Sequence, residues 1–304
     1  MSTWIILQQM AVIAILVCIG VYLYKKNVID EVTSKKMSTI VMDIVNPALV
    51  MSCVITGDMN MSHRDLLQAV GVCVVLYAFL CVLGVILPRI LPIQPSERKY
   101  YNMMTVYTNV GFIGIPLAKA ILSDSAILYV IICNVIFCLL FYTHGVQVLS
   151  GKKEKVQWKR IFTPGTIMSC LTLVLFWFDI TLPAVLANSI VYVGNATVFL
   201  SMCLLGVSIA KSSVKEGFKE KGLWLYIMLR MLLVPIAFGY ILRLLGFEGE
   251  MVQAFCLMLA MPVANLPLIQ AEKTGEDTAL LSRGIIVTTL VSFFTVTLVM
   301  SLLF

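Results

Sequence analysis

Two polar strings inside apolar segments hold the residues best suited to bind a ligand in this chain. The first, T-N-V-G-F-I-G-I-P-L, occupies residues 108–117, and the second, M-P-V-A-N-L-P-L, occupies residues 261–268. Proline lacks a backbone donor and clashes with the preceding helical turn, while glycine lets the chain leave helical geometry. Both strings are therefore expected to interrupt a helix. The freed backbone groups, together with the amides of Asn109 and Asn265, can then hydrogen-bond a polar ligand.

The two strings occupy matching positions in an internal repeat. Adding 151 to the numbers of four residues of the first string and its continuation, Pro116, Gly111, Gly114 and Lys119, gives Pro267, Pro262, Asn265 and Gln270. A second landmark pairs Asn46 with Asn195 at an offset of 149. The two offsets agree within two residues, which predicts one duplication of the chain.

The composition places these strings in a membrane. Of 304 residues, 60% are hydrophobic and 12% are charged, and the mean hydropathy is +0.98, whereas about 25% of the residues of a soluble domain are charged. A bilayer core about 30 Å thick takes about 20 helical residues for each crossing. Continuous apolar runs predict ten transmembrane helices near residues 4–24, 38–56, 66–87, 101–122, 125–149, 161–178, 184–210, 222–245, 251–271 and 280–303.

Five spans in each repeat turn the second copy upside down relative to the first. The predicted fold is an all-α polytopic membrane protein of two inverted five-helix repeats, residues 1–149 and 161–304, joined by a basic cytoplasmic linker at 150–160. Inverted repeats are typical of secondary transporters, in which Gly- and Pro-interrupted helices at matching positions surround the substrate. Predicted helices 4 and 9 are such a pair.

The loop charges predict the orientation. Lys and Arg cluster after predicted helices 1, 3, 5, 7 and 9, whereas the opposite loops hold only Arg64 and Arg243. Short cytoplasmic loops carry the excess of positive charge, so both termini are predicted outside a plasma (inner) membrane. The net charge of +6 then faces the anionic inner leaflet and requires no nucleic-acid partner.

The broken helices favour an anionic substrate. The N-terminus of a half-helix carries a positive partial charge, which suits a carboxylate without many cationic side chains. The predicted substrate-binding residues are Asn109, Gly111, Gly114, Pro116, Lys119, Pro262, Asn265, Pro267 and Gln270. Structural alternatives without a role in binding stay open. The prolines only kink two helices, Asn109 only caps one of them, and the Lys119 side chain only reaches the outer interface of the membrane.

Charged and polar residues in other predicted helices are candidates for handling a coupled H+ or Na+. Asp43 precedes Asn46 by three residues, which places both on one helical face, and Asn195 is the repeat mate of Asn46. A carboxylate paired near the cytoplasmic end is the alternative for Asp43. Arg230, in predicted helix 8, either attracts substrate or extends to the interface.

Other function classes find less support. The nine cysteines all lie in apolar runs without a C-x-x-C motif, and His63 and His144 are far apart, so no metal site, cofactor or enzymatic cluster is predicted. A carrier for a small organic anion is the leading hypothesis. A channel or a membrane-embedded ligand sensor on the same fold is the alternative.

Three segments resemble the auxin efflux carrier family, which includes bacterial malate and malonate permeases and plant auxin exporters. They are N-P-A-L at 46–49, N-V-G-F-I-G-I-P-L-A-K at 109–119 and P-V-A-N-L-P-L-I-Q-A-E-K at 262–273. The resemblance implies that helices 4 and 9 cross at their prolines beside the substrate. It also implies a scaffold of helices 1, 2, 6 and 7, often dimeric, against which helices 3–5 and 8–10 move as an elevator. The short central loop departs from the long loop of plant members.

Overall fold

The described part of the chain is helical throughout its regular structure. In the computed structural model, residues 3–56, 61–150, 161–211 and 217–304 are described, and they form helices and no strand. Seven helical segments are long and apolar enough to cross a membrane: Ile6–Lys25, Glu31–Ile55, His63–Ile90, Asp124–Ser150, Ala184–Lys211, Lys221–Leu244 and Ala279–Leu303. Three shorter apolar helices are Val110–Ile121, Pro164–Trp177 and Glu250–Ala260. This is a polytopic membrane architecture, and ten crossings require the shorter helices to enter the bilayer as well.

Each predicted apolar run contains helix, and the ends of the helices differ from the predicted boundaries. The first half contains α1 (Thr3–Lys25), α2 (Glu31–Ile40), η1 (Val41–Val45), α3 (Asn46–Thr56), α4 (His63–Ile90), η2 (Pro95–Glu97), α5 (Arg98–Val106), η3 (Val110–Gly114), α6 (Ile115–Ile121), α7 (Asp124–Leu140), η4 (Phe141–Gly145) and α8 (Val146–Ser150). The second predicted helix starts earlier than residue 38 because the Asp30 carboxylate accepts the Thr33 N–H at 2.7 Å and caps α2.

The described part of the second half is helical as well. It contains α9 (Pro164–Trp177), α10 (Ala184–Lys211), α12 (Lys221–Tyr226), η6 (Ile227–Leu233), α13 (Val234–Leu244), α14 (Glu250–Ala260), α15 (Leu266–Thr274) and α16 (Ala279–Leu303). Residues 151–160, nearly all of the predicted basic linker, lie outside the described residues.

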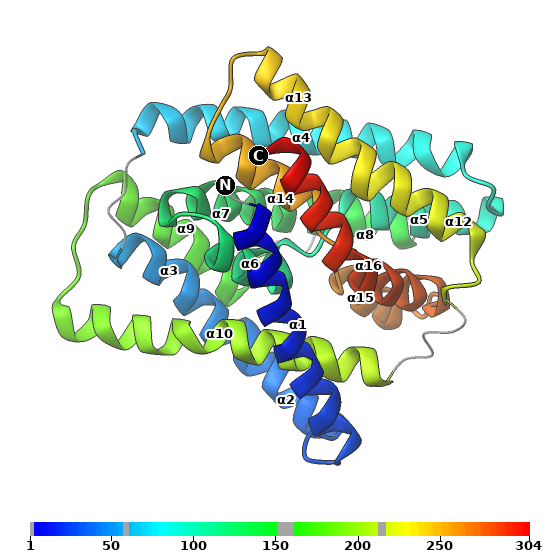
Figure 1. The fold of residues 1–304 in the computed structure, drawn as a ribbon, viewed down its shortest axis with the longest axis horizontal. Helices are drawn as coiled ribbons and strands as arrows, with labels where there is room; N and C mark the ends of the chain where they lie inside the picture. Colours follow the sequence, from blue (N-terminus) through cyan, green and yellow to red (C-terminus); the bar gives the residue numbers. More distant parts are fainter. Residues whose placement is uncertain (1–2, 57–60, 151–160, 212–216) are drawn as a thin grey trace.

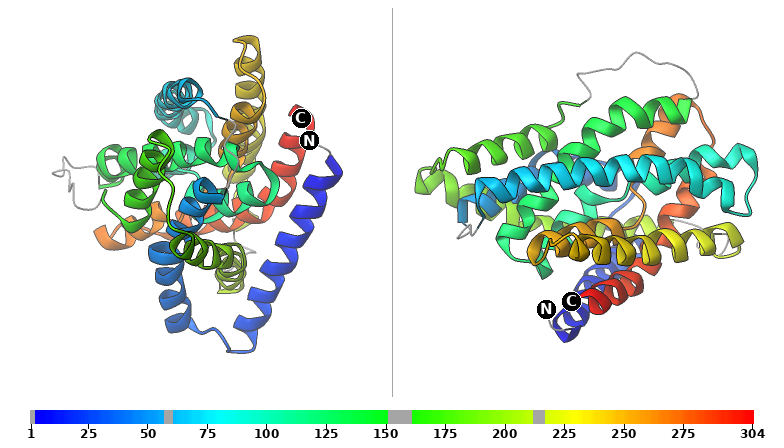
Figure 2. Two further views of the ribbon diagram at one scale, coloured as in Figure 1. Left: turned by 90° about the vertical axis from the view of Figure 1, so that its left-hand side faces the viewer. Right: turned by 90° about the horizontal axis from the view of Figure 1, so that it is seen from above.

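The helices form two groups with the interrupted elements between them. In Figure 1, α1, α2, α3 and α10 lie on one side of the molecule, α4, α12 and α13 lie on the opposite side, and α6 and α7 lie between them. The N- and C-terminal ends lie close together in all views of Figures 1 and 2.

Four described helical segments widen to π-helical geometry: η1, η3, η4 and η6. Each carries polar or glycine residues discussed above, namely Asp43 in η1, Gly111 and Gly114 in η3, His144 in η4 and Arg230 in η6. Such bulges are frequent at functional sites because they leave backbone groups outside the regular ladder. The local irregularity and the polar residues of the spans therefore coincide.

Helices α1 and α10 touch through their backbones. A Cβ added at Gly20 would lie 2.0 Å from the carbonyl oxygen of Cys203, and one added at Gly206 would lie 2.1 Å from that of Val17. Small residues permit this close approach, which drives helix association in lipid through van der Waals packing. The two glycines are thus required by the crossing of α1 with α10.

We expect Gly20→Ala to destabilise the folded protein by about 1–3 kcal/mol, because the added methyl group must push two backbones apart. The matched control is Gly71→Ala in α4, where a Cβ meets no atom within 4 Å. Thermal unfolding in detergent, followed by tryptophan fluorescence, measures both variants. Equal melting temperatures for the two would contradict the close packing of α1 against α10.

Candidate functional site

Two interrupted helices cross through a short antiparallel pairing of their backbones. Helix α5 ends at Val106 and η3 begins at Val110, while α14 ends at Ala260 and α15 begins at Leu266. Between these ends, the Asn109 N–H donates to the carbonyl oxygen of Pro262 at 2.7 Å, and the Ala264 N–H donates to that of Tyr107 at 3.0 Å. Each break thus supplies hydrogen-bonding partners for the other, which an interior without water requires.

The crossing includes Pro262 and lies before Pro116 and Pro267 in the chain. Pro116 sits in the first turn of α6 and Pro267 in the first turn of α15, whereas the paired residues are 107–109 and 262–264. The resemblance implied a crossing at the prolines of the two helices, and the pairing includes Pro262 but neither Pro116 nor Pro267. Pro267 is tolerated there because the N–H groups of a first helical turn have no intrahelical acceptor, whereas η3 continues directly into α6, so Pro116 lies inside the helix Val110–Ile121. Of the three predicted prolines, Pro262 alone is part of the crossing.

Pro116 nevertheless shapes the site through a carbonyl group. In η3 the hydrogen bonds reach back five residues, as from the Ile115 N–H to the carbonyl oxygen of Val110. The next donor in this series would be Pro116, which has no N–H, so the carbonyl of Gly111 receives no such bond. The side-chain Nδ2 of Asn46 donates to that carbonyl at 2.9 Å instead. One proline thus creates an acceptor that links the broken helix to α3.

A cavity of about 290 Å³ lies beside the crossing. Its wall comes from η1 and α3, from the crossing and η3, from α7 and η4, and from the starts of α9 and α15. The amide side chains that line it are Asn46, Asn109, Asn134 and Asn265, and the apolar or aromatic ones include Met42, Phe112, Phe137, Tyr142, Leu266 and Ile269. Asp43 is the charged residue of the lining, which contains neither lysine nor arginine.

The amides serve the backbone and face the cavity. Asn109 Oδ1 accepts the Phe112 N–H at 3.1 Å and so caps η3, which was one of the two roles considered for it. Asn46 Oδ1 is buried and has no hydrogen-bond partner among the described residues. A buried polar atom left unpaired costs about 1–3 kcal/mol. A donor from a ligand or a water molecule in the cavity would remove that cost.

Several predicted residues lie outside the lining. Gly114 is buried where an added Cβ would lie 3.0 Å from the Met258 Sδ, and Gln270 is 4% exposed inside the helical core. Lys119 forms an ion pair with Asp124 at the start of α7. The cavity therefore gathers Asp43, Asn46, Asn109, Gly111 and Asn265 of the predicted set, and leaves out Gly114, Lys119, Gln270, Asn195 and the three prolines, Pro116, Pro262 and Pro267.

Asn195 lies on an exposed face of α10, apart from the cavity. The offset of the crossing strings, 151, pairs Asn46 with Thr197 rather than with Asn195. Two residues of an α-helix differ by about 200° in direction, so the shift turns the asparagine away. Thr197 is fully buried, and its hydroxyl donates to the carbonyl oxygen of Val45 at 2.9 Å.

Asn134 in α7 also lines the cavity, although it was not among the predicted site residues. It is 9% exposed, its Nδ2 donates to the Ser169 Oγ at 3.3 Å, and its Oδ1 would lie 3.2 Å from a Cβ at Gly111. The sequence signal was a lone amide in the apolar run of α7. A lone amide in an apolar run does not reveal its neighbours, so its place at the site follows only from the packing of α7 against η3.

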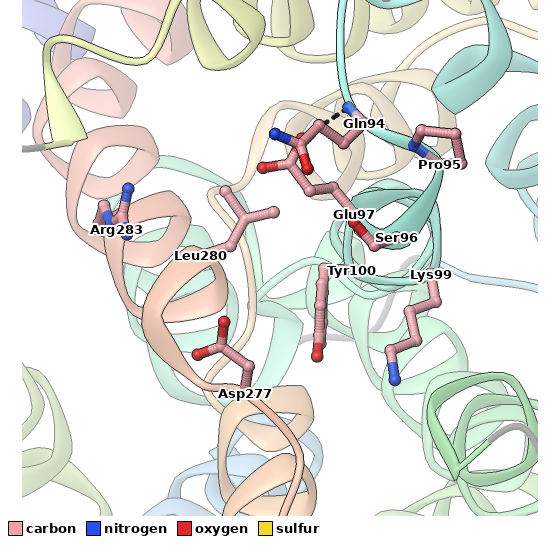
Figure 3. A pocket seen from close by; sticks show the side chains of 9 residues that line it. All are labelled: Gln94, Pro95, Ser96, Glu97, Lys99, Tyr100, Asp277, Leu280 and Arg283. Carbon is pink, nitrogen blue, oxygen red and sulfur yellow. Dashed lines mark hydrogen bonds between the residues drawn. The ribbon is translucent and has the colours of Figure 1, made fainter.

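A second cavity, of about 630 Å³, opens between η2, α5 and the start of α16 (Figure 3). Its lining residues are Gln94, Pro95, Ser96, Glu97, Lys99, Tyr100, Asp277, Leu280 and Arg283. The charged groups already have partners in the protein: Lys99 pairs with Glu276, Arg283 pairs with Glu220, and the carboxylates of Glu97 and Asp277 accept the N–H groups of Gln94 and Ala279. These contacts hold neighbouring segments of the chain in place. The amide-lined cavity is therefore the better candidate for a binding site.

Comparison with known proteins agrees with the architecture. A family model described as membrane transport protein matches residues 5–300. An uncharacterized transporter of Methanocaldococcus jannaschii is 23% identical over 300 residues, which cover 94% of this chain and 95% of that protein. An uncharacterized transporter of Methanothermobacter thermautotrophicus is 22% identical over 288 residues, or 92% of each chain. The chain therefore belongs to this family of membrane transport proteins, the auxin efflux carrier family that its motifs resemble.

Proposed function

We propose that the protein is a secondary carrier that binds a small organic anion, a malate-, malonate- or auxin-like carboxylate, in the cavity beside the crossing. The crossing carries this proposal, because it brings the N-terminal ends of the helix Val110–Ile121 and of α15 (Leu266–Thr274) to one cavity. Each helix N-terminus is equivalent to roughly half a positive elementary charge. The two ends together attract an anion although the lining holds no basic side chain.

The dimensions and chemistry of the cavity favour a compact substrate. Its volume of about 290 Å³ is near the lower end of the range for ligand sites, about 300–1,000 Å³. Amide groups from Asn109, Asn134 and Asn265 offer donors to a carboxylate, while Phe112 and Phe137 offer apolar contact to the rest of the molecule. A small acid with an apolar part matches both surfaces.

The inverted ten-helix plan and the elevator movement are part of the same proposal. Breaks at matching positions of the two repeats support the inversion, and the separation of α1, α2, α3 and α10 from α4, α12 and α13 suits a scaffold facing a moving group (Figure 1). The hydrogen bond from Asn46 to Gly111 joins α3 of the first group to the interrupted helix that begins with η3. Movement of the substrate across the membrane must break it, so it belongs to one end state of the cycle.

The charge of the substrate and the membrane potential together favour one direction of net transport. An inside-negative potential favours export of a monovalent anion by about 2.3 kcal/mol per 100 mV. Uptake against that potential requires a coupled cation, and Asp43 is the carboxylate available in the lining to carry a proton or hold Na+. The same cavity thus serves export without coupling or uptake with it.

Purified protein in proteoliposomes should show saturable uptake of at least one labelled carboxylate among malate, malonate, lactate and indole acetate, with counterflow when the lumen is loaded with unlabelled substrate. Counterflow arises because a carrier exposes one loaded site to each side in turn. Linear, non-saturating flux would favour a channel, and binding without flux would favour a sensor. No flux and no binding of any of the four acids would refute the proposal.

Asn46→Leu should lower the initial rate about tenfold or more, equal to about 1.4 kcal/mol, because it leaves the Gly111 carbonyl without its donor and removes the polar group at Asn46 Oδ1. The matched control is Asn195→Leu at the predicted repeat mate on the exposed face of α10. Its rate should equal that of the unaltered protein. Equal losses in both variants would place the site elsewhere.

Asp43→Asn should remove the dependence of uptake on an imposed proton or sodium gradient, because the neutral amide carries no exchangeable charge. Exchange of substrate for substrate should persist, since the crossing and its amides are unchanged. Gradient-driven uptake and counterflow, measured in the same vesicles, separate the two effects. Unchanged gradient-driven uptake would exclude Asp43 from coupling.

A further inference from the structure

Arg230 is a fully buried cation that forms no ion pair with any described residue. It lies in η6, is 1% exposed, and lines neither of the two cavities above. Its Nε donates to the carbonyl oxygen of Thr105 at 2.8 Å, and its Nη1 donates to that of Leu259 at 2.8 Å. Such a charge is expensive in a bilayer unless protein groups compensate it. Neither role expected for it, attraction of substrate or extension to the interface, matches this position.

The two carbonyls belong to the ends of the two half-helices that lead into the crossing. Thr105 is in the last turn of α5, which ends at Val106, and Leu259 is in the last turn of α14, which ends at Ala260. The hydroxyl of Tyr226 adds a donor to the same region, 2.7 Å from the carbonyl oxygen of Met104. One side chain therefore joins the C-terminal ends of both broken helices.

The charges at these ends balance. A helix C-terminus is equivalent to roughly −0.5 elementary charge, so two of them together offset about one positive charge. The guanidinium group of Arg230 supplies that charge, and its Nη2 has no acceptor among the described residues. The hydrogen bonds from Nε and Nη1 therefore hold the guanidinium group. Its positive charge is compensated by carbonyl dipoles rather than by a carboxylate.

The opposite ends of the crossing have no buried counter-charge bonded to them among the described residues. The N-terminal ends of η3 and α15 face the cavity, whose lining contains one carboxylate, that of the exposed Asp43. The crossing therefore has a fixed cation at its C-terminal ends and an open site at its N-terminal ends. In broken-helix carriers generally, the C-terminal ends and unwound carbonyls are the groups that coordinate a coupled Na+.

We propose that Arg230 is a positioning residue that takes the place of a metal cation at the two half-helix C-termini, so that the crossing needs no bound sodium to keep its geometry. The proposal goes beyond the proposed function. It rests on that function only in taking the cavity beside the crossing as the site that moves. Coupling, where it exists, is then assigned to a proton carried by Asp43 and not to Na+, so that Na+ is expected to leave the unaltered protein unaffected. The fixed cation also holds α5 and α14 in one unit, because a single planar group bonds to both.

Thermal unfolding tests this without any transported substrate, so its outcome is independent of the proposed function. The unaltered protein, Arg230→Met and Arg230→Lys are compared in detergent with equal ionic strengths of NaCl, LiCl, KCl or choline chloride. We expect the unaltered protein to melt at one temperature in all four salts. Arg230→Met should melt about 10 °C lower in choline and regain part of that loss saturably with Na+ or Li+, because the uncompensated carbonyls attract a small cation.

Two further variants separate charge from shape. Arg230→Lys keeps the charge and should remain folded, with a smaller loss and no response to the choice of cation. Arg243→Met is the matched control, because Arg243 lies in α13 and bonds to the carbonyl oxygen of Leu303 beside the Phe304 ring at the end of the chain. It should show no specific effect of Na+ or Li+.

The proposal fails on any of four results: saturable stabilisation of the unaltered protein by Na+, an Arg230→Met variant as stable in choline as the unaltered protein, a folded Arg230→Met variant without a cation response, or a lysine variant that loses as much stability as the methionine variant. If Arg230→Met does not fold in any salt while Arg230→Lys does, the requirement for the charge is supported. In proteoliposomes, replacing Na+ by choline should leave counterflow in the unaltered protein unchanged.

Discussion

The structure depends on one constraint, which is that peptide groups released from a helix inside a membrane must find partners within the protein. Each unpaired group in hydrocarbon costs several kcal/mol, so neither break would be stable alone. The breaks satisfy one another through Asn109, Pro262, Tyr107 and Ala264, and the hydroxyl of Thr288 accepts the remaining Val263 N–H at 3.2 Å. The antiparallel pairing thus fixes the place of the crossing, and every other feature of the site is arranged around its four helix ends.

The four helix ends differ in the sign of their partial charge. The C-terminal ends meet a permanent positive group, Arg230, while the N-terminal ends open into a cavity lined by amides. A permanent anion at the N-terminal ends would compete with the substrate, and a vacant C-terminal site would leave a negative centre in the bilayer. Under the proposed function, the carried anion supplies the negative charge that the N-terminal ends lack.

The apolar runs and the paired strings made the helical membrane fold and the two interrupted helices predictable from the sequence. Hydropathy and proline chemistry act locally, so they can be read along the chain. The exact crossing could not be read in this way, because Pro116 lies inside the helix Val110–Ile121 and Pro267 in the first turn of α15, while the break forms where two distant backbones pair. The role of Arg230 was equally hidden, since its partners are main-chain carbonyls, which have no signature in the sequence.

The predicted repeat is most informative where the two matched segments use the same position differently. The carbonyl of Gly111 corresponds to that of Pro262 at the offset of 151. In the first repeat this carbonyl is freed by Pro116 and bound by the side chain of Asn46, whereas in the second repeat it accepts the Asn109 N–H within the crossing. Symmetry at the position of Asn46 is broken as well, because Thr197 stands at the strict offset and bonds to the Val45 carbonyl instead. A perfectly symmetric crossing would offer two equal sites on either side of it. The departure at these two positions leaves an amide with an unpaired acceptor on one side alone, and this is the side on which the cavity lies.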